Sequence, residues 1–357
     1  MPARSASATD PWATKERELV LDILGLGLFG AAVLWTYVSA WVNGGSPDSV
    51  VTVLVAVVIV FVIARLVADE SGWIVPGAVA MLAATAAVVF LSDLAARGPL
   101  TGPLGYSNAS AALYLQGSVA ACMGAVAAPK RVLRVAGLVL AVALAVTTVL
   151  AGSDAASLLL LLPVAGLVVR TKGGVRKLIV VFLGLFLIAL SLTLFLGAIW
   201  VDGRSDLVGR VVEESLSGRR PALWHDAIEL TTQRPLVGVG PGRFRDESPL
   251  AVSDSDAAWA HNGFLQQGAE GGVPALVLAV SIFVWGFARL LSIQQGRVAG
   301  LAAASLTALG IQACIDYVLH FPILPMMAAA LLGAAVGAAP RSVGTRSRTH
   351  ERQHTGT

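Results

Sequence analysis

The chain has 357 residues, of which 56% are hydrophobic and 13% are charged, and its mean hydropathy is +0.77. So few charges over this length exclude a soluble globular protein and predict an all-helical integral membrane protein. The formal net charge of +3 says little alone, because in a membrane protein the distribution of Lys and Arg among the loops carries the information. No nucleic-acid partner is expected. Cys122 and Cys314 both lie in apolar runs, so no disulfide is expected either.

The predicted elements begin after a polar terminus, residues 1–18, which is typical of disorder. The apolar run 19–42 is too long for a secretory signal core and lacks a cleavage motif, so we expect a retained first helix. Later runs are long enough, or nearly so, to span roughly 30 Å of hydrocarbon. They lie at about 49–68, 73–95, 107–128, 132–151, 155–170, 177–200, 272–290, 298–318 and 322–339. This predicts about ten transmembrane helices, grouped at 19–200 and 263–340, with a polar loop at 201–262 and a basic tail at 341–357.

The basic residues are distributed unequally among the segments between these runs. With a cytoplasmic N-terminus and alternating helices, the cytoplasmic segments hold most of the basic residues and every lysine, as the positive-inside rule requires. The predicted topology therefore places both termini in the cytoplasm and the 201–262 loop outside the plasma (inner) membrane. It requires a tight hairpin at Gly152-Ser153-Asp154, where little chain separates two runs.

The outward loop concentrates the residues that carry chemistry. All its basic residues are arginines, and arginine binds phosphate in a bidentate way; alternatively, these arginines pair with the acidic residues of the same loop. Pro221 fits an early helical position, and one stripe at helical spacing follows it, made of Leu223, Trp224, Ala227, Ile228 and Thr231. We predict a short amphipathic helix at the outer interface, anchored by Trp224 and ended at Arg234-Pro235.

A glycine-rich turn, Gly238-Val239-Gly240-Pro241-Gly242, follows this helix. Its glycines allow backbone N–H groups to approach an anion closely, although a turn of this kind is also a common way to reverse the chain. Arginines flank it on both sides. The candidate diphosphate site therefore consists of Arg219, Arg220, Gly240, Gly242, Arg243 and Arg245.

Three motifs in this region occur in a recognisable order. They read G-R-x-P-x-x-W from Gly218, P-L-x-G-V-G-P-G-x-F from Pro235, and A-H-N-x-x-L-Q-x-x-x-E-x-G from Ala260. The set resembles the O-antigen ligase and polymerase superfamily of bacterial membrane glycosyltransferases. Asn108, at the start of an earlier run, and the stretch Asp316 to Pro322 resemble further parts of that family.

The resemblance implies that a glycan moves from a polyprenyl-diphosphate carrier to a glycan or lipid acceptor on the outer leaflet, without a metal or other cofactor. Arginines, Arg219 among them, would stabilise the charge on the departing diphosphate. An acceptor hydroxyl must also lose a proton, and histidine titrates near working pH.

Among the outward histidines, we favour His261 as the general base, because it lies in the motif directly before an apolar run. Asn262 would orient His261 or the acceptor. His320 is the rival, since Asp316 lies four residues earlier and the pair would share a helix face; Asp316 alternatively pairs with a loop arginine. His225 ranks third. Supporting roles are expected for Trp224, Asn108, Asp316, His320 and Glu270, whose flanking glycines predict a helix break.

One departure from the family pattern concerns a mid-chain helix that often opens with Ser-Arg-Gly. Here the stretch reads Gly152-Ser153-Asp154-Ala155, so an acid stands where the family has a cation. Another arginine replaces it, the donor differs, or activity is lost. Two other functions therefore stay open: a lipid-linked sugar flippase or exporter, disfavoured because the polar groups gather on one side and no repeat is visible, and a catalytically silent envelope-assembly subunit.

Overall fold

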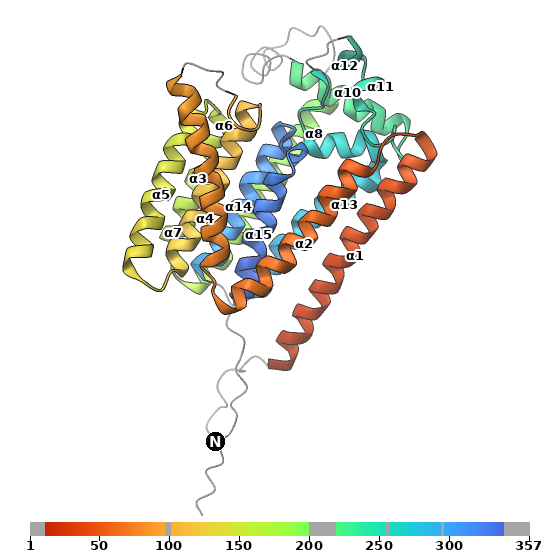
Figure 1. The fold of residues 1–357 in the computed structure, drawn as a ribbon. Helices are drawn as coiled ribbons and strands as arrows, with labels where there is room; N and C mark the ends of the chain where they lie inside the picture. Colours follow the sequence, from red (N-terminus) through yellow and green to blue (C-terminus); the bar gives the residue numbers. More distant parts are fainter. Residues whose placement is uncertain (1–10, 97–100, 200–218, 254–256, 294–295, 339–357) are drawn as a thin grey trace, which may run out of the picture.

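The computed structural model describes residues 11–96, 101–199, 219–253, 257–293 and 296–338, and every regular element within these ranges is helical (Figure 1). Eight of these helices are long and apolar enough to cross a membrane. Two shorter apolar stretches, Asp154–Val168 and Ile323–Gly337, join them in the same bundle. The prediction of an all-helical membrane protein is therefore confirmed, with eight full-length candidate spans and two shorter apolar stretches where about ten spans were predicted.

The helices of the bundle coincide closely with the predicted apolar runs. Their bounds are α1 Pro11–Asn43, α2 Asp48–Glu70, α3 Ile74–Ala95, α4 Ser107–Ala127, α5 Arg131–Leu150, α6 Asp154–Leu159, α7 Leu161–Val168, α8 Lys172–Ile199, α13 Gly263–Ser292, α14 Arg297–Ile315 and α15 Ile323–Gly337. The expected tight hairpin before Asp154 is present, since α5 ends at Leu150 and α6 begins at Asp154. The Ser153 hydroxyl accepts the Ala156 N–H and caps α6. The prediction of disorder across 1–18 was wrong for residues 11–18, which form the first turns of α1.

The centre of the bundle is formed by α4 and α14, most of whose residues are buried. Both are rich in Ala, Gly and Ser, which let neighbouring backbones approach closely in a membrane. A Cβ added at Gly117 would lie 2.2 Å from that of Ala83 on α3. The Ser305 hydroxyl donates to the Gln116 side chain at 2.5 Å and its carbonyl accepts from the same amide at 3.0 Å, so this polar pair is satisfied inside the apolar core.

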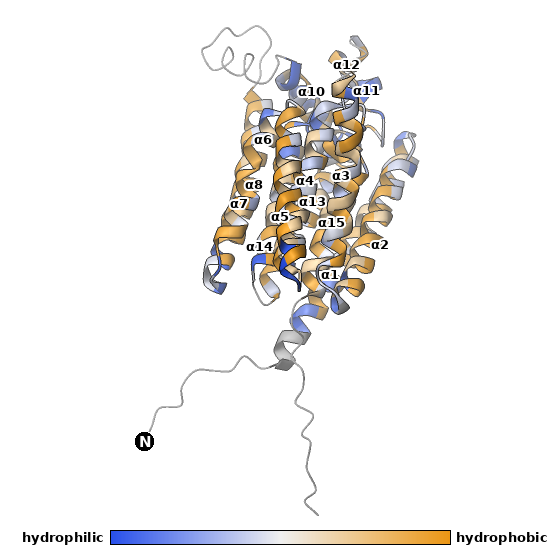
Figure 2. Cartoon of the chain, turned by 60° about the vertical axis from the view of Figure 1, so that its left-hand side comes forward, coloured by the Kyte–Doolittle hydropathy of each residue, from blue (hydrophilic) through white to orange (hydrophobic). Residues whose placement is uncertain are grey.

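The two ends of the bundle differ. Hydrophobic residues line the shafts of the helices, while hydrophilic residues gather at the ends and over a helical cap at one of them (Figure 2). The cap consists of α10 Arg219–Gln233, α11 Phe244–Glu247 and α12 Pro249–Ser253. Asp22 near the start of α1 contacts Arg65 near the end of α2, and Ala338 after α15 lies beside Gly72. The N-terminal part of α1 and the end of α15 therefore lie at the uncapped end, where the turn between α2 and α3 also lies.

The cap has a small apolar core of its own. The predicted amphipathic helix is present as α10 and ends at Gln233, directly before Arg234-Pro235. Its predicted interfacial anchor was wrong, however, because Trp224 is fully buried. The indole packs among cap residues and donates its Nε1–H to the His261 carbonyl at 3.2 Å. Trp224 thus fixes the cap to the start of α13.

A break in α13 holds the cap in place. Gly272 has φ 72° and ψ −175° within the helix, which confirms the break predicted from the glycines beside Glu270. The opened turn pairs with the glycine-rich turn: Val239 N–H donates to the Ala269 carbonyl and Gly240 N–H to the Glu270 carbonyl, both at 2.9 Å. Val273 N–H donates to the Pro235 carbonyl at 2.8 Å. These backbone bonds satisfy groups that the helix break would leave unpaired.

Candidate active site

A carboxylate at the capped end of the bundle contacts side chains from three other segments. Helix α14 ends at Ile315, and Asp316 follows in an extended conformation. Its Oδ1 lies 3.1 Å from His261 Nδ1. Its Oδ2 accepts the Tyr106 hydroxyl and the Asn108 amide, each at 2.7 Å, and Arg220 Nη2 at 3.3 Å. The end of α14 therefore organises the N-termini of α4, α10 and α13 around one charge.

His261 is held in a backbone conformation that non-glycine residues rarely adopt. Its φ is 48°, a left-handed geometry that costs free energy and occurs often at functional sites. On one side its carbonyl accepts the Trp224 indole, and on the other Asn262 caps α13. The ring of Tyr317 meets the imidazole edge-on, with centroids 4.8 Å apart. The imidazole orientation is thus fixed by its ring contacts as well as by its backbone.

The cluster is electrostatically arranged around an ionised Asp316. Burial alone would raise the pKa of Asp316, but hydrogen bonds from His261 and Tyr106 and the charge of Arg220 outweigh it, so the pKa lies below its ordinary value. Burial, with the Asp316 charge, raises the pKa of Tyr317 to about 12 and that of Tyr106 further still. At neutral pH the carboxylate is therefore charged, and both tyrosines stay protonated.

The side chains of the cluster differ in their exposure to solvent. The Asp316 side chain is 4% exposed, whereas those of His261 and Arg220 are each 18% exposed. Arg220 also donates to the Ile315 carbonyl at 2.9 Å, which fixes its position at the end of α14. Arg219, its neighbour at the start of α10, is exposed. His261 and the two arginines are therefore accessible at the surface of the capped end, while Asp316 lies beneath them.

In the structure, Asp316 contacts His261 and does not contact the rival histidine, His320. The expected shared helix face was wrong, because α14 ends before Asp316 and His320 lies in a separate 3-10 turn, Val318–His320. His320 Nε2 lies 3.3 Å from the Gln266 amide nitrogen, and its ring centroid is 4.0 Å from that of Trp259. The alternative pairing of Asp316 with a loop arginine is present, with Arg220. His225 lies apart from the cluster, with Nδ1 3.3 Å from the Gly197 carbonyl.

Comparison with known families identifies one matching segment of the chain. Residues 136–280 match the family model described as O-antigen ligase. The chain carries an O-antigen ligase domain. No curated protein matches the chain. The matched segment contains His261 and Arg220, while Asp316, Tyr106 and Asn108 lie outside it and complete the cluster from α14 and α4.

Within the O-antigen ligase domain, Asn262 is a structural residue. It was predicted to orient His261 or the acceptor, and its side chain is fully buried. Its Oδ1 accepts the Phe264 and Leu265 N–H groups at 3.0 Å each, and its amide donates to the Cys314 carbonyl at 2.6 Å. Asn262 orients His261 through the backbone, by starting α13 and tying it to the end of α14.

Glu270 and Gln266 connect the cap to this region of the domain. The Gln266 amide donates to Glu270 Oε1 at 3.0 Å, and its Oε1 accepts the Ala260 N–H at 3.2 Å, directly before His261. Backbone N–H groups of Gly242 and Phe244 also hydrogen-bond the Glu270 carboxylate. The supporting role expected for Glu270 is therefore visible as a link between the glycine-rich turn and α13.

The backbone N–H groups of the glycine-rich turn form hydrogen bonds within the protein. The N–H groups of Gly240 and Gly242 donate to Glu270, so the structure engages the groups that we predicted would face a diphosphate. Arg243 donates to the Asn43 carbonyl at 2.6 Å and to Glu247 at 2.7 Å. Arg245 is exposed and lies 4.0 Å from Asp246. Of the four predicted arginines, Arg220 contacts Asp316; Arg219 is its exposed neighbour at the start of α10, and Arg243 and Arg245 lie on the far side of the glycine-rich turn.

Tyr106 and Tyr317 are the site residues that we missed from sequence. Their rings stack on each other with centroids 4.8 Å apart, and they lie between α4 and the chain after α14. A signal existed in each case, because each tyrosine lies next to a polar residue at the end of an apolar run. Aromatic residues at such positions are so common in membrane proteins, where they anchor helices at the interface, that the signal did not point to a site.

Proposed function

We propose that the protein is a membrane glycosyltransferase that moves a glycan from a polyprenyl-diphosphate carrier to the hydroxyl of a glycan or lipid acceptor, at the capped end of the bundle. The observation that carries the proposal is the Asp316 carboxylate shared by His261 and Arg220. It joins a proton acceptor to a phosphate-binding cation at one place in a chain with an O-antigen ligase domain.

His261 is the general base of this proposal. With Nδ1–H donated to Asp316, Nε2 carries the lone pair and can accept the proton of the acceptor hydroxyl. Asp316 holds this tautomer and stabilises the imidazolium that forms, as carboxylates do in other base-orienting arrangements. The low pKa of Asp316 keeps the carboxylate ionised, so the proton stays on His261.

The arginines at the start of α10 act on the other side of the reaction. As the acceptor oxygen bonds to the anomeric carbon, the bond from that carbon to the diphosphate oxygen breaks, and its electron pair leaves with the diphosphate. Arg219 and Arg220 stabilise the charge that develops there. Two guanidinium groups in this position give the route charge stabilisation without a metal.

The orientation follows from the distribution of basic residues. We place the capped end outside the plasma (inner) membrane and both termini in the cytoplasm, which puts the site where a carrier presents its glycan to acceptors of the cell envelope. Ser253 on α12 is exposed, while Cys122 and Cys314 are buried. An impermeant maleimide added to intact cells should label the cysteine of the Ser253→Cys variant. Labelling only after cell lysis would show that the capped end faces the cytoplasm.

The test of the function is turnover by the purified full-length protein. Incubated with polyprenyl-diphosphate glycan and an acceptor, it should release free polyprenyl diphosphate and form a longer glycan or a new conjugate in equal amounts. Movement of the carrier across a vesicle without release would instead identify a flippase. Binding without release or movement would identify a catalytically silent subunit. Asp154, which stands where the family has an arginine, is the residue that motivates this third outcome.

A further inference from the structure

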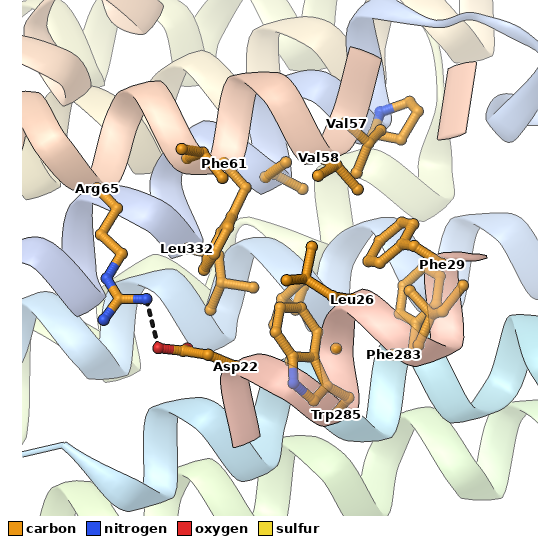
Figure 3. A pocket seen from close by; sticks show the side chains of 18 of the residues that line it. Asp22, Leu26, Phe29, Val57, Val58, Phe61, Arg65, Phe283, Trp285 and Leu332 are labelled. Carbon is orange, nitrogen blue, oxygen red and sulfur yellow. Dashed lines mark hydrogen bonds and ion pairs between the residues drawn. The ribbon is translucent and has the colours of Figure 1, made fainter. Parts of the chain in front are cut away.

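The uncapped half of the bundle contains a cavity of about 160 Å³ between α1, α2, α13, α14 and α15 (Figure 3). Its walls are apolar for most of its extent and include Phe29, Val58, Phe61 and Trp285. Leu26 on α1 and Val62 on α2 also line it, and they are 61% and 41% exposed. The cavity therefore opens between α1 and α2 onto the surface that faces lipid, far along the bundle from His261.

One end of this cavity is charged. Asp22 and Arg65 line it and form an ion pair with 2.7 Å between Oδ2 and Nη1. The other Asp22 oxygen accepts Arg289 Nε at 3.0 Å. Arg289 is fully buried, and among the described residues its Nη2 has no hydrogen-bond partner. One carboxylate thus serves two guanidinium groups, and the cluster keeps a net positive charge at the cavity.

The position of Arg65 decides what this charge can do. Its side chain is 30% exposed, whereas that of Arg289 is completely enclosed. Asp22 is shared with the inaccessible Arg289, so its single negative charge does not neutralise both guanidinium groups. The excess positive charge is therefore accessible at Arg65, at the edge of the cavity. An occupant that matches this arrangement has an apolar chain and an anionic group at one end, because buried or half-buried charge is stabilised by a partner of opposite sign.

We propose that this cavity binds an anionic glycerophospholipid, with one acyl chain between α1 and α2 and the headgroup phosphate on Arg65. The lipid comes from the leaflet at the uncapped end, which is the cytoplasmic leaflet in the orientation given above. Basic residues at that face attract anionic lipid, and a cavity open to the bilayer admits an acyl chain laterally. The site is separate from the proposed transfer reaction and does not depend on it.

The test measures lipid retained by the full-length protein. The protein is reconstituted with equal phosphatidylglycerol and phosphatidylethanolamine, extracted into mild detergent, and examined by native mass spectrometry. Wild type should retain phosphatidylglycerol in preference to phosphatidylethanolamine. Arg65→Gln should lower that retention about tenfold, as expected when a charge-assisted hydrogen bond is lost, while Arg176→Gln, which removes an exposed arginine from α8 at the same end, should leave it unchanged.

A second pair of variants guards against a folding defect in Arg65→Gln. Val62→Trp places a ring at the mouth of the cavity and should also expel the lipid, whereas Ile59→Trp, on an exposed position of α2 that does not line the cavity, should not. Equal retention of both lipids, or unchanged retention in both Arg65→Gln and Val62→Trp, would overturn the proposal. So would displacement of phosphatidylglycerol by an equal amount of added polyprenyl phosphate, because the cavity would then belong to the carrier.

Discussion

Two carboxylates mark the two ends of this molecule, and each is shared by two basic side chains. At the capped end Asp316 contacts His261 and Arg220, and at the uncapped end Asp22 contacts Arg65 and Arg289. The difference is the histidine. A guanidinium keeps its proton at any physiological pH, whereas an imidazole exchanges its own. The Asp22 cluster can therefore only hold charge, while the Asp316 cluster can also move a proton.

The largest effect should come from removing that histidine. His261→Ala should lower the transfer rate by about 10²- to 10⁴-fold, the usual contribution of a general base, because no other group takes the acceptor proton. Release of polyprenyl diphosphate by purified protein measures it, and His225→Ala provides a control at the same end of the bundle. Wild-type turnover by a folded His261→Ala protein would reassign the base.

The arginine at the start of α10 should matter next. Arg219→Ala should lower transfer by about 10²-fold, since one group that stabilises developing charge is removed. The effect should appear in kcat, measured at saturating carrier. Arg245→Ala removes an exposed arginine from the cap and should leave kcat close to wild type; an equal loss in both variants would mean that the net charge of the cap matters and its position does not.

At the uncapped end, removing the charge of the shared carboxylate should lower the stability of the fold. Asp22→Asn leaves Arg289 buried without its counter-charge, which should cost about 2 kcal/mol, less than for a fully buried pair, because Asp22 is 23% exposed. Thermal unfolding in detergent measures the loss. Transfer by the fraction that remains folded should stay near wild type, and a catalytic defect without a stability defect would remove the contrast between the two clusters.

The smallest expected effect is a pH dependence of stability. The folded-state pKa of Asp316 is lowered, so its stabilisation is fully present above the ordinary carboxylate pKa and is lost as pH falls through the folded value. As the pH falls below about 4, the unfolding temperature of wild type should therefore fall more steeply than that of Asp316→Asn. Parallel curves would show that Asp316 does not stay ionised by virtue of the fold.

The spans were predictable because each is a separate stretch of apolar sequence, and the length needed to cross a bilayer is fixed. The break beside Glu270 was readable from its glycines. The partner of Asp316 was not, since the choice between His261 and His320 depends on where α14 ends, and an apolar run does not mark a helix end to the residue. Trp224 was misplaced for a related reason: an amphipathic stripe shows which face is apolar without showing whether lipid or protein covers it.

The Asp22 cluster was also missed, although an acid inside the first apolar run is a recognised sign of a built interaction. Its partners lie in the second and eighth predicted spans, and nothing in a single sequence joins them. The N–H groups of the glycine-rich turn posed the same difficulty. The acceptors of the Val239 and Gly240 N–H groups are backbone carbonyls of α13, which carry no side-chain identity and leave no trace in the sequence.

That last feature bears on how the protein can diversify. The cap is fastened to the broken α13 through main-chain bonds, at positions where added Cβ atoms would collide with backbone: Gly238 against Glu270, and Gly272 against Leu236. Glycine is required at these positions, but the main-chain hydrogen bonds do not depend on the identity of the neighbouring side chains. Away from Arg219, the exposed side chains of α10–α12 can therefore change while the cap keeps its position relative to His261.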